Sequence, residues 1–230
     1  VKKFGGTSVA NRERILHVAK RCKKEYEKGN DVVVVLSAMG DVTDRLIDKA
    51  KEINETPSER EMDMLFTIGE QMSVALMAMA LEGLGVPAVS LNAFQAKIHT
   101  TSVHGDAKIT HIETERIREE LAQKKIVIVT GFQGNCRCIR TASAKCGIII
   151  IFIDALAAAL QADACEIYTD VDGVYTADPR KVPTAKKLDE ISYDDMLHMA
   201  LNGAQVLHSR CVELAKKFEI PLVVRSSMNE

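Results

Sequence analysis

Short runs of apolar, mostly β-branched residues alternate with longer amphipathic stretches along this chain. The runs are apolar at successive positions, as in strands that are buried on both faces of a parallel sheet; they are Asp31–Leu36, Lys125–Thr130, Cys165–Thr169 and Ile220–Arg225. The stretches between them carry apolar residues at helical spacing; they are Arg12–Glu27, Asp44–Ile53, Ser58–Leu84, Thr114–Gln123, Tyr193–Ala200 and Ala204–Phe218. This alternation predicts an α/β fold, a three-layer αβα sandwich around a mainly parallel central sheet.

The composition is that of a globular protein with a substantial core. Hydrophobic residues make up 47% of the 230 positions, and no linker rich in proline, glycine or serine divides them, so we expect one compact domain. A net charge of −2 leaves no basic surplus for a nucleic-acid backbone, which argues against nucleic-acid binding. Without an apolar run of 18 residues or a signal peptide, we expect a cytoplasmic protein with no membrane helix. The six irregularly spaced cysteines indicate reduced thiols.

Candidate chemistry lies directly after the predicted strands, where open parallel sheets bind their ligands. Near the N-terminus, Lys3 is followed by Gly5 and Gly6. Glycines let backbone N–H groups approach an anion, and a lysine adds a mobile charge, so this segment is typical of a phosphate cradle. Gly-Gly-Thr-Ser is also an ordinary turn, and the segment alone leaves both interpretations open. Glycines and hydroxyls recur after later strands, at Ser37–Asp44, Gly131–Gly134 and Tyr168–Tyr175.

Six motifs in one order carry a specific resemblance to a known family. They are KFGGTSV at Lys3–Val9, SAMGDVTD at Ser37–Asp44, EREMDMLFTIGEQ at Glu59–Gln71, VHGDAKIT at Val103–Thr110, VTGFQG at Val129–Gly134, and the segment Tyr168–Leu197. The chain resembles the catalytic domain of the aspartate kinases, which belong to the amino acid kinase family. The resemblance runs over nearly the entire chain and implies the amino acid kinase fold.

The resemblance also implies roles for individual residues. Lys3 would reach the phosphates and the transferred group as the catalytic residue; the other nucleotide-binding residues implied are Gly5, Gly6, Thr7, Ser8, Thr169, Asp170, Tyr175 and Arg180. The residues implied to bind the amino acid are Ser37, Thr43 and Glu70, with Glu70 pairing with the substrate ammonium. Taken alone, Thr43 could cap the following helix, and Asp178–Arg180 could form a turn. Glu70 is harder to explain in that way, because an unpaired buried carboxylate is costly.

The implied reaction is the ATP-dependent phosphorylation of L-aspartate to 4-phospho-L-aspartate, the first step toward lysine, threonine and methionine. The β-carboxylate is already ionised at neutral pH, because its reference pKa is about 3.9, so no general base is required. Mg²⁺ would be held through the phosphates of ATP. No protein metal site is expected, since Cys136, Cys138 and Cys146 match the spacing of zinc sites poorly.

The resemblance covers the kinase domain only. Aspartate kinases usually continue into ACT regulatory domains, and this sequence stops at Arg225–Glu230, about where that portion begins. We therefore expect residues 1–230 to be one catalytic domain, with the ACT domains absent. Kinases of this family commonly pair through helices that flank the sheet, which implies a homodimer. Met72, Met77 and Met79 are a candidate apolar face, although packing in the core explains them equally well.

One segment departs from the family. At Asn135–Ile153 the family has a hairpin and a Gly-Arg-Gly-Gly-Ser-Asp loop, whereas here only Gly147 lines up with that loop. The missing arginine and aspartate would hold the substrate carboxylate and organise the transfer site. Three hypotheses therefore stay open: an aspartate kinase, another small-molecule carboxylate kinase, or a catalytically impaired protein of the same fold that binds nucleotide or mediates dimerisation.

Overall fold

A parallel sheet forms the centre of the molecule. The computed structural model describes residues 1–103, 107–131, 133–136, 140–143, 149–179, 181–204 and 206–228. The six strands of this sheet are ordered β10-β9-β1-β2-β6-β3, and every pair is parallel. Their bounds are β1 Lys2–Phe4, β2 Val33–Leu36, β3 Ala88–Leu91, β6 Ile126–Thr130, β9 Cys165–Thr169 and β10 Leu222–Ser226.

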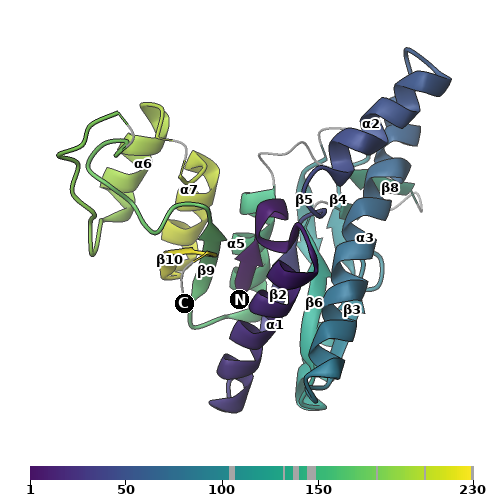
Figure 1. Ribbon diagram of the computed structural model, residues 1–230, viewed down its shortest axis with the longest axis horizontal. Coiled ribbons are helices and arrows are strands. Elements are labelled where there is room, and N and C mark those ends of the chain that lie inside the picture. The colour runs from purple at the N-terminus through teal and green to yellow at the C-terminus, as the bar shows by residue number, and fades with distance from the viewer. Residues whose placement is uncertain are drawn as a thin grey trace.

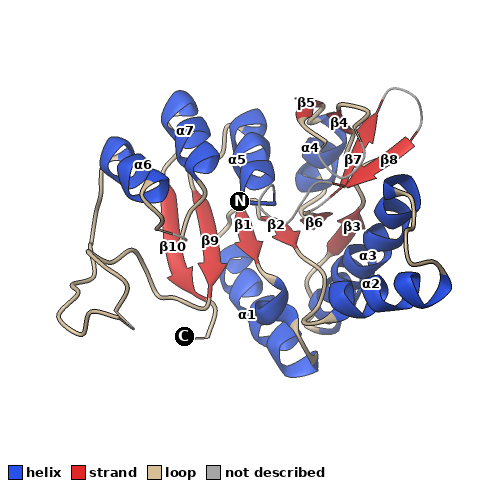
Figure 2. Ribbon diagram, turned by 90° about the horizontal axis from the view of Figure 1, so that it is seen from above, coloured by secondary structure: helices blue, strands red, loops and turns tan. Residues whose placement is uncertain are grey.

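Helices cover both faces of this sheet, as Figures 1 and 2 show, which confirms the predicted sandwich. Helices α1 to α3 lie on one side, and α4 to α7 lie on the other. Their bounds are α1 Arg12–Glu27, α2 Val42–Ile53, α3 Glu59–Gly83, α4 Glu115–Ala122, α5 Ile149–Leu160, α6 Tyr193–Leu201 and α7 Ser209–Phe218. A short 3₁₀ helix, η1, spans Gly6–Val9.

The alternation of side chains along each strand divides the core in two. On β2, Val33 and Val35 face the cluster under α5 and α7, whereas Val34 and Leu36 face the cluster under α1 and α3. Successive residues of a strand point to opposite faces, so a run of four buried residues serves both clusters. Burial on both faces explains why the sequence shows continuous apolar runs there.

Two features of the fold differ from the sequence prediction. Helix α7 begins at Ser209 and not at Ala204, because the His208 side chain caps it by accepting a hydrogen bond from the Arg210 N–H at 3.3 Å. A second sheet of four strands, ordered β5-β4-β7-β8, was not predicted. Its strands are short and partly polar, and their bounds are β4 Ile98–Thr100, β5 Ile109–Ile112, β7 Gln133–Cys136 and β8 Arg140–Ser143.

Helix α3 is long and apolar enough to cross a membrane, since an 18-residue window within it has a mean hydropathy of 1.5. This corrects the expectation that no apolar span of that length exists. The helix packs along β3 and β6, and its buried face carries Asp63 and Glu70 at 1% and 3% exposure. Met77 is buried on that face as well, whereas Met72 and Met79 are exposed, so these three methionines do not form one apolar face. Because 44% of that 18-residue window is also buried within the domain, we interpret α3 as a helix of the folded domain.

Helix α5 begins at Ile149, inside a run of β-branched residues that does not favour a helix. Burial outweighs that preference, because Phe152 and Leu156 pack into the core at 3% and 0% exposure. The same helix buries Asp154 completely. The Cys165 thiol donates to Asp154 Oδ1 at 3.5 Å, and Oδ2 has no hydrogen-bond partner among the described residues. Burial raises the pKa of Asp154 to about 7, although hydrogen bonds from Cys211 and Cys165 oppose the rise.

Asp154 should make the fold less stable as the pH rises. Its pKa of about 7 in the folded protein lies above the ordinary value of 3.8, so the folded state binds the proton more tightly. The stability that protonated Asp154 contributes is complete below pH 3.8 and is lost as the pH rises through 7. The pKa difference of about three units corresponds to a loss of roughly 4 kcal/mol in the free energy of unfolding.

The variant Asp154→Val should remove this part of the pH dependence. Urea unfolding between pH 4 and pH 8 measures it, with Asp48→Asn as a control at an exposed aspartate. If the Asp154→Val protein keeps the same slope of unfolding free energy against pH as the parent, the buried carboxyl does not control the pH dependence of stability.

Candidate active site

Lys3 lies on the central strand of the sheet, where β1 pairs with β2 on one side and β9 on the other. Its side chain is half-buried and folds across the glycine turn that follows the strand. A Cβ atom built on Gly5 would lie 3.5 Å from Lys3 Nζ. The ammonium is therefore held at the carboxyl edge of the sheet, beside backbone that carries no side chain.

The loops after β1 and β2 interlock. The Ser37 N–H donates to Phe4 O at 3.3 Å, and the Gly40 N–H donates to Gly6 O at 3.0 Å. Gly6 is required by this approach, since a Cβ there would lie 2.4 Å from Ala38 O. Gly40 has a φ of +48°, which favours glycine as well. The two loops thus place Ser37 next to the end of the lysine strand.

Helix α3 comes close to the same loops at Gly69, the residue before Glu70. A Cβ on Gly69 would lie 3.0 Å from Ala38 Cβ and 3.3 Å from Val42 Cγ1, so the glycine allows this approach. Ala38 follows Ser37, and Val42 precedes Thr43. Three elements distant in sequence therefore meet where the amino-acid-binding residues were predicted. Thr43 is not the cap of α2, because Asp41 occupies that position.

A cavity of about 790 Å³ opens beyond the carboxyl end of β9. Three predicted nucleotide-binding residues line it, namely Thr169, Asp170 and Tyr175. Thr169 Oγ1 donates to the Asp170 carboxylate at 2.8 Å, and the Tyr175 hydroxyl donates to Asp172 Oδ1 at 2.8 Å. The Tyr175 hydrogen bond lowers the pKa of Asp172, which also contacts Lys187 at 3.3 Å.

Part of the cavity wall was missed by the sequence analysis. The end of α6 and the turn after it contribute Met199, Asn202 and Gly203. Gly203 has a φ of +101°, and the Asn-Gly pair is a helix-stop signal that could have drawn attention to this turn. Lys181 is a further lining residue and supplies a cation to the cavity.

The remaining predicted residues divide into two groups. The cavity lining does not include the four residues after β1, Gly5, Gly6, Thr7 and Ser8. They nevertheless lie near it in the sheet, because β1 pairs directly with β9. Thr7 is exposed, whereas Ser8 is 3% exposed and its hydroxyl has no hydrogen-bond partner within the described ranges. Arg180 lies outside the described residues, as do Cys138, Cys146 and the segment 144–148. Cys22, Cys165 and Cys211 are free thiols and are buried.

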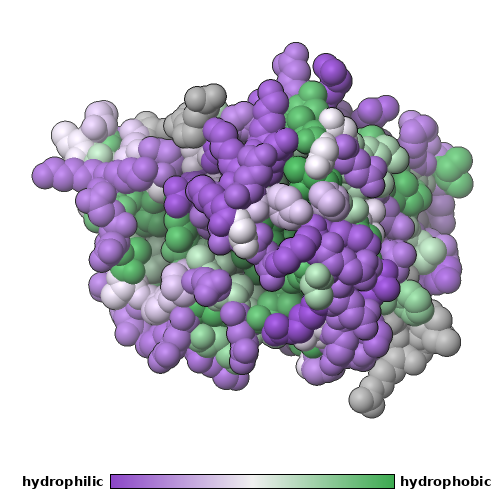
Figure 3. All heavy atoms as spheres, turned by 90° about the horizontal axis from the view of Figure 1, so that it is seen from below, coloured by the Kyte–Doolittle hydropathy of each residue, from purple (hydrophilic) through white to green (hydrophobic). Residues whose placement is uncertain are grey.

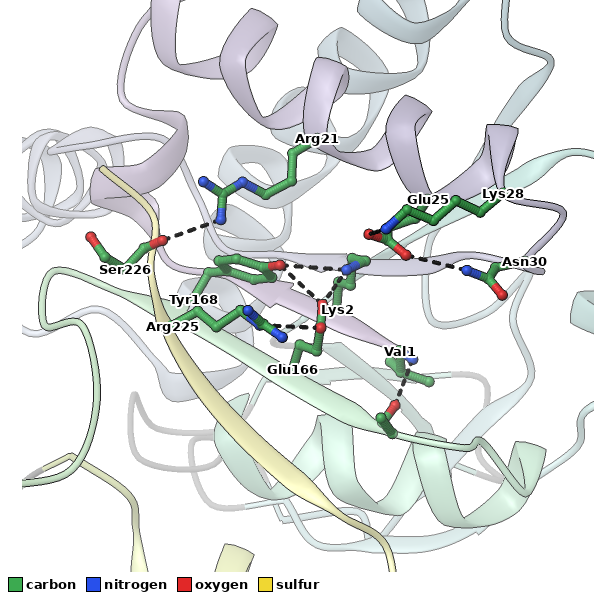
Figure 4. A network of polar contacts seen from close by, with 11 residues as sticks. Val1, Lys2, Arg21, Glu25, Lys28, Asn30, Glu166, Tyr168, Arg225 and Ser226 are labelled. Atoms are coloured by element: carbon green, nitrogen blue, oxygen red, sulfur yellow. Dashed lines mark hydrogen bonds and ion pairs between the residues drawn. The ribbon is translucent and has the colours of Figure 1, made fainter. Parts of the chain in front are cut away.

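A polar network fixes the opposite face of the lysine strand (Figure 4). Lys2 is buried there, forms an ion pair with Glu166 of β9, and lies 3.4 Å from the Tyr168 hydroxyl. Arg225 of β10 contacts the other oxygen of Glu166 at 3.3 Å. Burial would lower the pKa of Lys2, but the hydrogen bond and charge of Glu166 outweigh it and the pKa is raised.

Comparison with known proteins places this arrangement in a family. Residues 1–226 match the model of the amino acid kinase family. The aspartokinase of Geobacillus stearothermophilus is 56% identical over 228 residues, which cover 99% of this chain and 56% of that protein. The chain therefore spans little more than half the length of this relative.

Two solved structures are similar over the whole chain. The aspartate kinase from Synechocystis has a TM-score of 0.87 and 45% identity, covering 100% of this chain and 38% of that one. E. coli aspartokinase III in complex with aspartate and ADP has a TM-score of 0.88 and 27% identity, covering 99% and 62%.

The contact between Gly6 and Ala38 generates a test of the interlocked loops. Gly6→Ala should lower the free energy of unfolding by about 1–3 kcal/mol, because the added methyl displaces one loop from the other. Gly83→Ala is the matched control, since a Cβ there meets nothing within 4 Å and the position ends a helix. That variant should be neutral or more stable by up to about 1 kcal/mol. Equal stability of the two variants in urea unfolding would refute the close packing of Gly6 against the Ala38 carbonyl.

Proposed function

The chain belongs to the amino acid kinase family, and we propose that it transfers the γ-phosphoryl group of ATP to the β-carboxylate of L-aspartate. The product would be 4-phospho-L-aspartate. The similarity to aspartokinases over 99% of the chain supports this substrate. We further propose that residues 1–230 act as one catalytic domain of a cytoplasmic enzyme in the biosynthesis of lysine, threonine and methionine.

The order of strands is the observation that carries the proposal. In the sheet, β1 stands between β9 and β2. Lys3 on β1 therefore lies between the cavity beyond β9 and the loop after β2, which packs against Gly69, the neighbour of Glu70. A phosphoryl group that passes from a nucleotide in the cavity to an amino acid near Glu70 would cross the position of the lysine.

On the nucleotide side, Thr169, Asp170 and Tyr175 would bind ATP within the cavity they line. We propose that Arg180 and the backbone of Gly5, Gly6, Thr7 and Ser8 complete the phosphate contacts. The carboxylate of Asp170 suits Mg²⁺, which prefers oxygen ligands and would be held mainly through the phosphates. The ion would neutralise charge on the transferred group.

On the amino-acid side, Glu70 would pair with the α-ammonium of aspartate, and the hydroxyls of Ser37 and Thr43 would orient the substrate. The β-carboxylate is the nucleophile and needs no base, because it is ionised at neutral pH. Catalysis then consists of alignment and of charge stabilisation by the Lys3 ammonium, which is already positioned over Gly5.

Two other functions were left open by the sequence. Another small-molecule carboxylate kinase would have less use for Glu70, because a buried acid close to the substrate loop suits a substrate with an amino group. A protein without catalysis was suggested by the replaced Gly-Arg-Gly-Gly-Ser-Asp loop, whose counterpart falls partly outside the described residues. The identity to aspartokinases over 99% of the chain favours the enzyme.

The two adjacent lysines give a matched test. Lys3→Ala should reduce aspartate-dependent ADP formation at least about 10²-fold with little change in stability, because its charge acts on the transferred group. Lys2→Ala should instead cost about 1–3 kcal/mol of stability, since it takes the buried ammonium away from the half-buried Glu166, whose carboxylate keeps only the more exposed Arg225 of the two cations described beside it. The folded Lys2→Ala protein should keep most of its turnover. A stable Lys3→Ala protein with more than about a tenth of parental turnover would contradict the proposal.

A further inference from the structure

The segment that joins β9 to α6 forms part of the cavity wall, and its described residues belong to no helix or strand (Figure 2). Tyr175 lines the cavity from this segment, and its backbone makes an isolated antiparallel bridge with Lys187. Beside this bridge, the Leu188 N–H donates to Val174 O at 2.8 Å. The segment therefore folds back on itself at the tyrosine.

Three polar side chains meet behind this part of the wall. The Tyr175 hydroxyl donates to Asp172 Oδ1 at 2.8 Å, and Lys187 Nζ donates to Asp172 Oδ2 at 3.3 Å. The two oxygens of one carboxylate thus link the tyrosine to the lysine. Neither Asp172 nor Lys187 is among the described residues that line the cavity. These two residues, here named the Asp172–Lys187 clamp, therefore hold Tyr175 from outside the cavity.

The carbon chain of Lys187 also packs against the wall. A Cβ built on Gly173, which lines the cavity, would lie 2.6 Å from Lys187 Cε. The lysine thus covers the glycine backbone with its carbon chain while its ammonium stays partly in water. This packing directs the Lys187 side chain toward Asp172, although that side chain is 46% exposed.

Exposure alone does not distinguish Lys187 from other lysines. The surface seen from below is mainly hydrophilic (Figure 3), and the neighbouring Lys186 is exposed as well. Lys186 takes part in the fold through its backbone, whose N–H donates to Thr176 Oγ1 at 3.0 Å. Within the described part of the chain, its ammonium forms no ion pair. Two adjacent lysines therefore carry the same charge, and only one of them contacts the carboxylate that binds Tyr175.

We propose that the Asp172–Lys187 clamp positions Tyr175 for the nucleotide. The inference rests on the proposed function, since it takes the cavity as the nucleotide site. A ring that is tethered at its hydroxyl before the nucleotide arrives loses less conformational freedom on binding, which strengthens the binding. Lys187 is thus a positioning residue that acts through Asp172 and Tyr175.

Lys187→Met tests the clamp, because it removes the ammonium and keeps a chain of similar shape over Gly173. In a calorimetric titration, the dissociation constant for Mg-ADP should rise about fivefold, as expected for the loss of a partly exposed ion pair. The KM for ATP should rise by the same factor, whereas kcat and the KM for aspartate should change by less than about twofold. Lys186→Met is the matched control and should bind Mg-ADP like the parent.

A double-variant cycle tests whether Lys187 acts through Tyr175. Tyr175→Phe removes the hydroxyl, keeps the ring, and should raise the dissociation constant for Mg-ADP about tenfold, because a hydrogen bond to a charged group is lost. Adding Lys187→Met to Tyr175→Phe should then weaken binding by less than about twofold more, since the tether is already broken. A further loss of about fivefold would overturn the inference, because the two residues would act independently.

A measurement without nucleotide separates the clamp from the proposed function. The hydrogen bond to Asp172 raises the pKa of Tyr175, so Asp172→Asn should lower that pKa in an ultraviolet titration of the phenols. The chain has four tyrosines and no tryptophan, and Tyr175→Phe identifies the phenol that shifts.

Three outcomes would overturn the inference. An unchanged titration of a folded Asp172→Asn protein would show that no tether holds Tyr175. Equal effects of Lys187→Met and Lys186→Met on Mg-ADP binding would show that the contact with Asp172 is irrelevant to binding. A parent protein that shows the Tyr175 shift but binds no Mg-ADP would contradict the proposed function, and the positioning role of the clamp with it.

Discussion

The contact between the buried Lys2 and Glu166 is the interaction on which the packing at the centre of the sheet depends. It joins β1 to β9 on the face below α1, and Arg225 extends it to β10. Tyr168 stacks on Phe4 with ring centroids 4.4 Å apart, and Arg21 lies over the tyrosine ring. Because successive residues of a strand point to opposite faces, Lys3 lies on the other face of β1, away from this network, and its backbone is held by the pairing of β1 with β2 and β9. Two adjacent lysines therefore serve separate purposes, one for the fold and one for the proposed chemistry.

Close packing of backbone completes the site. Gly6 approaches the Ala38 carbonyl, and Gly69 approaches the Ala38 methyl from α3. A single residue of the second loop is thus held from two directions by glycines that leave no room for a side chain. These contacts bring the lysine turn, the loop after β2 and the helix of Glu70 together, although these segments are separated by about 30 residues each along the chain.

Much of this arrangement could be predicted from the sequence. The apolar runs that predicted β2, β6 and β9 begin and end within two residues of the observed strands, because burial on both faces leaves a continuous apolar pattern. The second sheet could not be found in this way, since strands such as Ile98–Thr100 are too short for any period. Helix α5 contradicted local propensity, because packing against the sheet decided its conformation. The cavity wall at Met199 and Asn202 depends on how α6 docks, which no local pattern reports.

The proposed reaction forms an acyl phosphate on L-aspartate. An acyl phosphate reacts with hydroxylamine to give a stable hydroxamate, so the most direct measurement is incubation with ATP, Mg²⁺, L-aspartate and hydroxylamine. We expect aspartyl hydroxamate in an amount equal to the ADP formed, and none when aspartate is omitted. A protein that binds Mg-ATP in a calorimetric titration yet yields no hydroxamate from L-aspartate would contradict the proposed reaction and would favour the catalytically impaired form of the fold.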